Sequence, residues 1–292
     1  MARKSDWIIA GALIASGTVL FLLLALVFIV LMFGEDGELR YSSGKHIALV
    51  EINGPINNAR EIVAQIAKYR EDDSVPAIVL RVDSPGGVVA PTQEIFDELR
   101  KTREAGKIII ASMGSVAASG GYYVACVADS IVANPGTLTG SIGVIFELPN
   151  AEGLLRKIGV DWDVVKSGPH KDIGSIGRRM TYEERRLIQG VVDDVYNQFV
   201  EVVSRYRPLS RDEVIDLADG RVYTGNQARS LRLVDRLGTY EDAIQLAARM
   251  SGISGRPKII RERQKTFLER LVENMDSSTQ ARAWGSLEYR LQ

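Results

Sequence analysis

Ser119 lies where the chain could expose a nucleophile. It stands between two alanines and two glycines in Gly114-Ser-Val-Ala-Ala-Ser-Gly-Gly-Tyr-Tyr-Val-Ala125, where a strand-like run gives way to a helix-like run. A serine hydroxyl is a poor nucleophile near neutral pH until a base takes its proton. The chemistry that this sequence offers therefore depends on which base can reach Ser119.

Lys171 is the strongest candidate for that base. It lies among small residues in Ser167-Gly-Pro-His-Lys-Asp-Ile-Gly174. Burial or neighbouring positive charge lowers the pKa of a lysine and so makes a neutral amine available. The neighbouring Asp172 must point elsewhere, because a carboxylate facing the amine would keep it protonated. Adjacent residues in an extended loop do point apart.

A histidine base is the alternative. The sequence contains two histidines, His46 and His170. A Ser-His-Asp triad would have to use His170, with Asp172 or Asp129 to orient its ring. His46 is the weaker choice, because it stands at the entrance to the domain.

Two glycine-rich loops could supply an oxyanion site and a further hydroxyl. Backbone N–H donors stabilise the oxyanion formed during acyl transfer, and glycine allows close approach of the backbone. Gly87, at the end of Asp83-Ser-Pro-Gly-Gly87, and Gly120 would provide two such donors. A hydroxyl in Thr137-Leu-Thr-Gly-Ser-Ile-Gly143, such as that of Ser141, could orient the lysine amine. We find no metal-ligand spacing and expect chemistry without a metal or cofactor.

The elements that must position these residues read as alternating strands and helices. Such βαβ repetition predicts an α/β fold with a largely parallel sheet covered by helices. The runs Ile78-Val-Leu80 and Ile108-Ile-Ile110 are continuously apolar, as in strands buried on both faces. Loops at the carboxyl ends of such strands form the site, and here they are 83–87 and 112–119. The predicted strands are 47–52, 77–82, 108–112, 130–133 and 163–166, and the predicted helices are 59–69, 91–102 and one from about 118.

A long helix is predicted over 181–207. Thr181-Tyr-Glu-Glu184 has the spacing of a capping box, and apolar residues then recur at helical spacing. Helices near 212–218 and 240–250 complete a domain over 46–250. Residues 251–292 read as a loosely held tail, which could occupy the groove of its own or a neighbouring subunit, or be trimmed there.

The N-terminal region predicts a membrane anchor. Residues 7–33 carry no charge, and this run is longer than the ~20 residues that a helix needs to cross a bilayer. It continues without a convincing cleavage site, unlike a cleaved signal peptide. Basic residues precede it and mainly acidic residues follow it, which places the N-terminus in the cytoplasm and the domain outside. Residues 1–34 are thus a cytoplasmic stub with an uncleaved anchor, and 35–45 a tether.

Length and composition set further limits. The 292 residues give room for one sizeable α/β domain with appendages. With 36 basic and 37 acidic residues, the net charge of −1 gives no overall field that would attract nucleic acid. The single cysteine, Cys126, cannot form an internal disulfide, and its apolar neighbours predict that it is buried.

The chain resembles the signal peptide peptidase A family of membrane-anchored Ser/Lys peptidases, which belongs to the Clp protease and crotonase-like superfamily. The resemblance covers about 47–246. Its motifs are Asp83-Ser-Pro-Gly-Gly87, Ala118-Ser-Gly-Gly-Tyr-Tyr123, Gly140-Ser-Ile-Gly-Val144 and Ser167-Gly-Pro-His-Lys-Asp-Ile-Gly-Ser175.

The resemblance implies a role for each site residue. Ser119 matches the nucleophile, Lys171 the general base, Ser141 the hydroxyl that positions the lysine, and Gly87 with Gly120 the oxyanion donors. It also implies signal-peptide remnants and other membrane-proximal peptides as substrates, and a homo-oligomer whose neighbours share substrate grooves. Whether serine and lysine meet within one chain or across an interface stays open.

Two other functions remain compatible with the fold. Crotonase-like proteins also bind acyl-CoA, but that chemistry needs a soluble protein with catalytic carboxylates near the oxyanion site. A membrane scaffold could instead keep the fold and use its groove to hold peptides without cleaving them. Reaction of Ser119 with a serine-acylating reagent would separate a peptidase from such a scaffold.

Overall fold

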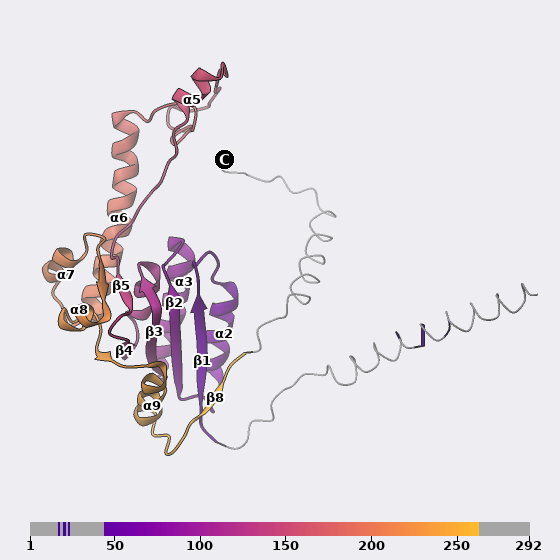
Figure 1. Cartoon of the computed structure of the whole chain (residues 1–292), viewed down its shortest axis with the longest axis vertical. Helices are drawn as coiled ribbons and strands as arrows, with labels where there is room; N and C mark the ends of the chain where they lie inside the picture. Colours follow the sequence, from indigo (N-terminus) through magenta and orange to yellow (C-terminus); the bar gives the residue numbers. More distant parts are fainter. Residues whose placement is uncertain (1–16, 18–19, 22, 24–43, 263–292) are drawn as a thin grey trace, which may run out of the picture. The chain divides into compact units, whose positions relative to one another are not determined.

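The computed structural model describes residues 17, 20, 21, 23 and 44–262, and Figure 1 shows the arrangement of its elements. The chain divides into two units, Met1–Gly44 and Lys45–Gln292. The predicted membrane span lies outside the described residues except at its four described positions, which are helical, and most of the predicted tail lies outside them as well. Within the described part, no helix combines the length and hydropathy that a bilayer crossing requires.

The second unit alternates strands and helices, as the sequence predicts. The strands are β1 (His46–Asn53), β2 (Ala77–Ser84), β3 (Ile108–Ala118), β4 (Ser130–Ala133), β5 (Leu138–Gly140), β6 (Val222–Thr224), β7 (Arg236–Leu237) and β8 (Lys258–Ile260). The helices are α2 (Arg60–Glu71), α3 (Val89–Glu104), α4 (Gly120–Ala125), α5 (Glu152–Lys157), α6 (Tyr182–Tyr206), α7 (Arg211–Leu217), α8 (Gly225–Ser230) and α9 (Tyr240–Met250).

All described strands belong to one mostly parallel sheet. Its main path runs β6-β5-β3-β2-β1-β8, and β4 pairs with both β3 and β7 off this path. Each pairing is parallel except that of β5 with β6, which is antiparallel. The prediction of a largely parallel α/β sheet is confirmed, and parallel strands bring their carboxyl ends to one edge.

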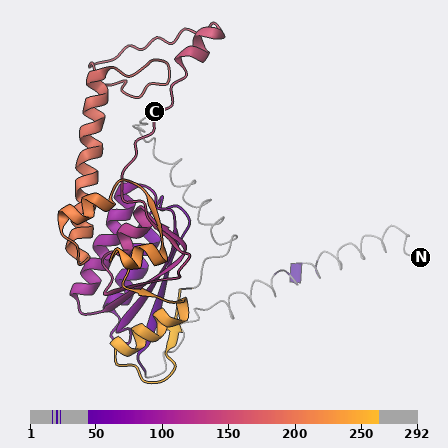
Figure 2. The ribbon, with the colours of Figure 1, turned by 60° about the vertical axis from the view of Figure 1, so that its left-hand side comes forward.

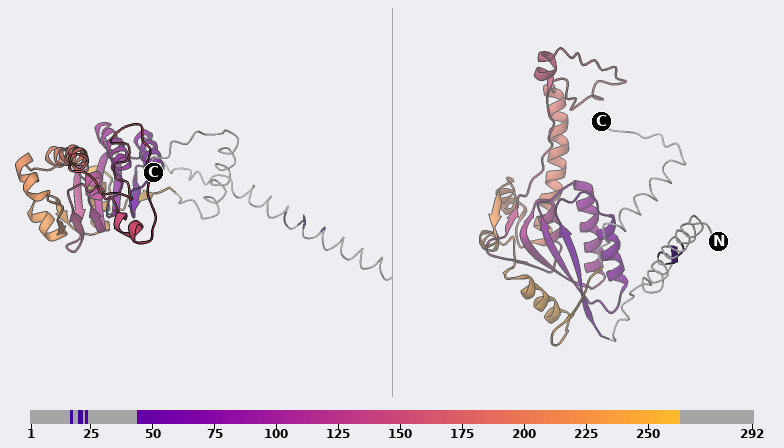
Figure 3. Two further views of the ribbon diagram at one scale, coloured as in Figure 1. Left: turned by 90° about the horizontal axis from the view of Figure 1, so that it is seen from above. Right: turned by 45° about the vertical axis from the view of Figure 1, so that its right-hand side comes forward.

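Helices cover both faces of the sheet, which explains why its central strands are apolar throughout. Along β1, Ala48 and Val50 face a core shared with α2, α3 and α4, whereas Ile47 and Leu49 face a second core shared with α9. Figure 3 shows α9 on the opposite side of the sheet from α2 and α3. Burial of each such Ile, Leu or Val side chain stabilises the fold by about 1.5–3 kcal/mol.

Strand β3 is longer than predicted, and successive parts of it pair with two different strands. Its first half pairs with β4, and Val116–Ala118 pair with β5. The register against β2 shifts at Val82 and Ser84, where the Val116 N–H donates to the Asp83 carboxylate at 3.0 Å. The prediction of a loop over 112–119 is therefore wrong, because β5 offers hydrogen bonds that carry the strand as far as Ala118.

Residues 144–192, here called the arm, extend along α6 beyond the sheet. Figures 2 and 3 show α5 and the loop after it at the N-terminal end of α6, away from the sheet. None of the residues 143–183 is buried. The predicted strand at 163–166 is wrong: this segment has no regular structure and Val165 is 99% exposed, since the arm offers it neither a neighbouring strand nor a core.

Helix α6 confirms the sequence prediction and explains how the arm is attached. The Thr181 side chain accepts from the Glu184 N–H, and the Glu184 side chain accepts from the Thr181 N–H, which completes a capping box. Phe199, Val200 and Val203, near the C-terminal end of the helix, are buried in the core. Helix α6 therefore has its C-terminal half in the domain and its N-terminal half in the arm.

Candidate active site

Ser119 lies at the junction of β3 and α4 in an uncommon backbone conformation. It is the residue before the first turn of α4, with φ 52° and ψ −122°. Its N–H donates to the Gly140 carbonyl at 2.8 Å, and its carbonyl accepts from the Tyr123 N–H at 2.9 Å. These bonds fix the turn on both sides, so the side chain is presented at the carboxyl edge of the sheet.

The Pro85-Gly-Gly87 loop packs directly against this turn. Gly86 has a φ of 102°, and a Cβ there would lie 2.7 Å from the Gly120 nitrogen and 2.9 Å from the Ser119 Cβ. The loop is held from its other side, because the Ile56 N–H donates to the Gly86 carbonyl and the Val88 N–H to the Ile56 carbonyl. Gly86 is a site residue that we did not predict, although it stands beside the predicted Gly87.

The N–H groups of Gly87 and Gly120 are neighbours. The Gly87 nitrogen lies 3.3 Å from the place where a Cβ on Gly120 would stand. Neither N–H donates a hydrogen bond to any residue in the described part of the chain. Two unused donors beside a serine hydroxyl are the arrangement that an oxyanion site requires.

Ser141 occupies the corresponding position on the neighbouring strand. Ala118 of β3 pairs with Gly140 of β5, so Ser119 and Ser141 each follow a paired residue at the end of adjacent strands. Ser141 also has a positive φ, 49°, and its N–H donates to the Arg221 carbonyl at 2.8 Å. Parallel pairing therefore brings together two serines that are separated in the sequence.

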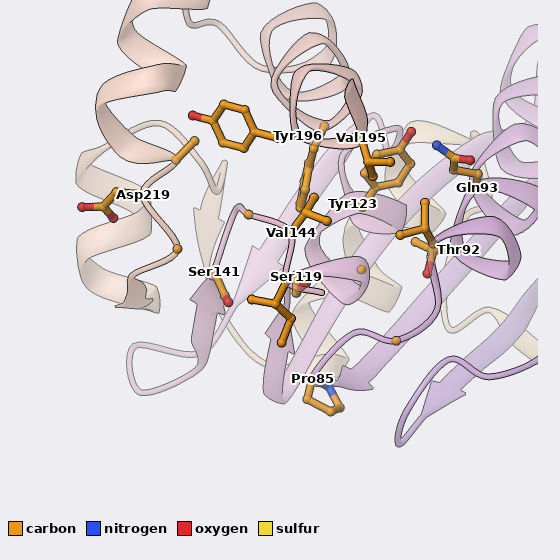
Figure 4. Close-up of a pocket in the computed structure, with 18 residues that line it drawn as sticks. Pro85, Thr92, Gln93, Ser119, Tyr123, Ser141, Val144, Val195, Tyr196 and Asp219 are labelled. Atoms are coloured by element: carbon orange, nitrogen blue, oxygen red, sulfur yellow. The ribbon is translucent and has the colours of Figure 1, made fainter. Parts of the chain in front are cut away.

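These residues line one cavity of about 530 Å³. Figure 4 shows Ser119 and Ser141 together at its floor, with Tyr123, Val195 and Tyr196 on its wall. The lining includes four predicted site residues, Gly87, Ser119, Gly120 and Ser141. Val195 and Tyr196 were not singled out as site residues from the sequence, because the apolar spacing of α6 is also typical of an ordinary core-facing helix.

Lys171 is not among the residues that line this cavity. It is exposed in the arm loop that follows α5. That loop is fixed near the start of α6, because Asp172 pairs with Arg178, which also pairs with Glu184. The cavity meets α6 at Val195, eleven residues beyond Glu184, which corresponds to about 16 Å of helix axis. The four-carbon stem of a lysine is much shorter than this separation.

The carboxylate of Asp172 does turn to other partners. It accepts from Lys166 Nζ at 2.5 Å and from Arg178 Nε at 2.8 Å. Hydrogen bonds from Arg178, and then from Lys166, hold the pKa of Asp172 well below its usual range. The expectation that this side chain points away from Lys171 agrees with these contacts.

The histidine alternative does not assemble within one chain. No histidine lines the cavity. His46 is buried at the amino end of β1, opposite the edge that carries Ser119, and His170 lies in the same arm loop as Lys171. Asp129 is engaged elsewhere, since it binds the Arg103 side chain and the Ile109 N–H.

The single cysteine is buried, as predicted. Cys126 lies in the core beside Tyr122 with no exposed surface. Burial raises the pKa of its thiol to about 12. A thiol in this state is a small apolar side chain and not a nucleophile.

Comparison with known proteins identifies first the fold class and then the protein family of this chain. The family model described as Clp protease matches residues 43–135, which agrees with the parallel sheet and with the half-buried serine at the turn between β3 and α4. The model described as Peptidase family S49 matches residues 101–254, just over half of the chain. The chain belongs to Peptidase family S49, a family of serine-type proteases, and the resemblance drawn from its motifs is confirmed.

Relatives from several bacteria support the same assignment. The chain is 47% identical over 213 residues to a Synechocystis protein named as a candidate protease, slr0021, covering 73% of this chain and 76% of that one. It is 36% identical over 248 residues to Protease 4 of Salmonella typhi, covering 82% and 40%. It is 38% identical over 216 residues to a candidate signal peptide peptidase SppA of Enterococcus faecium, covering 70% and 63%. The chain thus spans less than two thirds of the last two relatives.

Proposed function

We propose that this chain is a membrane-tethered serine endopeptidase in which Ser119 is the nucleophile and Lys171 the general base. The observation that carries the proposal is that one cavity contains Ser119, Ser141 and the unused N–H groups of Gly87 and Gly120. Its apolar wall suits an apolar side chain of a peptide next to the cleaved bond.

The chemistry follows from these positions. The neutral Lys171 amine takes the proton of Ser119 as Oγ bonds to the peptide carbonyl carbon, and the carbonyl oxygen becomes an oxyanion held by Gly87 and Gly120. The lysine ammonium then gives its proton to the leaving amine as the C–N bond breaks. Water, deprotonated by the same lysine, then attacks the acyl carbon, and the lysine ammonium returns the proton to Ser119 Oγ as the ester bond breaks. Each oxyanion donor contributes about 3 kcal/mol to the stabilisation of the transition state.

We further propose that a neighbouring copy of the chain supplies Lys171. The separation along α6 keeps this lysine from the Ser119 cavity of its own chain. The arm exposes apolar side chains away from this cavity, among them Ile158 at 62% and Val165 at 99%. Exposed apolar surface of this kind marks protein contact sites. A homo-oligomer in which one arm reaches the next cavity would bury this surface and complete the site, with Ser141 orienting the lysine amine.

The proposed substrates are signal-peptide remnants and other peptides close to a membrane. The support is the uncharged run 7–33, which would hold the domain next to a bilayer on its extracytoplasmic side. A relative named as a signal peptide peptidase agrees with this substrate class.

Digestion of membrane peptides by the full chain tests the proposal. The wild type should cleave them with a rate that rises towards alkaline pH, because the base must be neutral, and a serine-acylating reagent should label Ser119. Ser119→Ala and Lys171→Ala should each abolish cleavage while the circular dichroism spectrum is unchanged. Full activity of Lys171→Ala would exclude the Ser/Lys pair, and absence of both labelling and cleavage in the wild type would favour a peptide-binding scaffold.

A further inference from the structure

An ion-pair cluster holds the loop that carries Lys171. The cluster, here called the Arg178 clamp, consists of Lys166, Asp172, Arg178 and Glu184. Its carboxylates are well shielded for an arm without a buried core: the Asp172 side chain is 9% exposed and that of Glu184 is 5% exposed. Arg178 itself is 31% exposed and lies between the two carboxylates.

The guanidinium of Arg178 binds both carboxylates at once. Its Nε and Nη2 donate to the two oxygens of Asp172, each at 2.8 Å. Its Nη1 and Nη2 donate to the two oxygens of Glu184 at 2.8 and 2.5 Å. Glu184 also accepts from the Thr181 N–H in the capping box. The clamp thus joins the Lys171 loop to the first turn of α6 through a planar fork that lysine could not replace.

The charged and titratable groups in the Lys171 loop and in the elements bound to it come from three elements. The loop contributes Asp161, Asp163, Lys166, His170, Asp172, Arg178 and Arg179. Helix α6 contributes Glu184, which is engaged by Arg178. Helix α5 contributes Glu152, whose carboxylate accepts from the Arg179 N–H and pairs with Arg156. Among these carboxylates Asp172 is the one adjacent to Lys171 in sequence, and its bonds to Arg178 and Lys166 fix where it points.

A general base must lose its proton before it can act, and a carboxylate beside an amine opposes that loss. Asp172 is ionised at any pH at which a lysine base could work, because its pKa is lowered by Arg178 and Lys166. It would be a permanent negative charge next to Lys171 if it were free to turn. Occupation of both Asp172 oxygens by Arg178 removes that option.

We infer that Arg178 is a positioning residue for the general base: it holds the Asp172 carboxylate away from the Lys171 amine and fixes the Lys171 loop at the start of α6. The inference rests on the proposed role of Lys171 as the base. Arg178 acts through Asp172 and does not touch the peptide.

The first test is the pH dependence of kcat/KM. Arg178→Gln leaves Asp172 with Lys166 alone, so the limb on which kcat/KM rises with pH should move to a pH about one unit higher, the lower end of the effect of a nearby opposite charge. That shift is about a tenfold loss of activity below the pKa. Arg178→Gln combined with Asp172→Asn removes the freed charge and should return the limb to its wild-type position.

Arg179→Gln is the matched control. Arg179 is the next residue and makes no side-chain ion pair in the described part of the arm, so its profile should stay at the wild-type position. An unshifted limb in Arg178→Gln would overturn the inference. The inference would also be overturned if Arg178→Gln combined with Asp172→Asn were as impaired as Arg178→Gln alone, because Arg178 would then be needed whatever the charge at position 172.

The second test reads Lys171 without catalysis. In a Ser119→Ala background, the rate at which an amine-acylating reagent modifies Lys171 is followed against pH by peptide mapping, with and without Arg178→Gln. The pH at which this rate is half of its maximum should be about one unit higher with Arg178→Gln than without it. The same midpoint in both proteins would refute the inference. Because this measurement does not depend on hydrolysis, it separates failure of the clamp from failure of the proposed peptidase function.

Discussion

Two inactive variants, Ser119→Ala and Lys171→Ala, should restore peptidase activity when they share one assembly. The Ser119 cavity lacks Lys171, and the clamp fixes the Lys171 loop at the far end of α6. A chain that has lost its lysine can therefore still provide a complete cavity. A chain that has lost its serine can still provide the arm.

The size of the recovery follows from this geometry. In an equal random mixture, a site is complete when a Lys171→Ala chain supplies the cavity and its Ser119→Ala neighbour supplies the arm, so about one site in four is active. If the pair closed within each chain, no site would be complete. An equal mixture of wild type with the doubly substituted chain provides a second measurement. About one site in four should be active if serine and lysine come from neighbouring chains, against about one in two if both come from the same chain.

The assay requires mixed assemblies of known composition. The two variants are co-expressed with different affinity tags, purified through both tags, and compared with the wild type in the hydrolysis of a fluorogenic peptide. Activity close to a quarter of the wild-type value is expected. Mixed assemblies that are as inactive as their parents, with about half activity in the second mixture, would refute closure between neighbours.

Three further predictions concern the pocket wall, the core and the arm. The ring centroid of Phe199 lies 5.1 Å from that of Tyr123 on the wall, and Phe199→Ala should lower the free energy of unfolding by about 3 kcal/mol. The wider cavity should also accept larger side chains in a peptide library, and an unchanged side-chain preference would contradict this. The Cys126 thiol, with its pKa raised to about 12 by burial, should not react with a disulfide reagent at about pH 8 in the native state, and equal rates in native and denatured protein would contradict its burial. Arg178 lowers the pKa of Glu184 from 4.5 to about 2, so this carboxylate stabilises the arm fully above pH 4.5 and loses that effect as the pH falls through 2. Hydrogen exchange in the arm should show this step, and Glu184→Gln should reduce it to the part that Asp172, whose pKa Arg178 also lowers, contributes.

Local signals in the sequence predicted much of the fold. The continuous apolar runs at 78–80 and 108–110 are central strands, since helices cover both faces of the sheet. The capping box at Thr181 marks the start of α6, and α9 spans Tyr240–Met250 as predicted. Each of these signals depends on residues within a few positions of one another, which is why one sequence is enough to read them.

Features that depend on distant partners were not predicted. Val164 and Val165 have the composition of a buried strand, but a strand also needs a neighbour with free hydrogen-bonding groups, and the arm has none there. Strand β3 continues past Ser112 because of β5, more than twenty residues away in sequence. In the site, the glycines and serines were predicted by type, whereas the place of Lys171 depends on the ion pairs of Arg178.

The backbone conformation of Ser119 has a consequence for the stability of the protein. Its φ and ψ of 52° and −122° lie close to about +60° and −120°, the first central position of a type II′ turn, which glycine dominates. A side chain held in such a region costs about 1–3 kcal/mol. Folding would therefore favour glycine at position 119 and chemistry requires serine, so a Ser119→Gly chain should melt at a higher temperature than the wild type while it has lost its nucleophile.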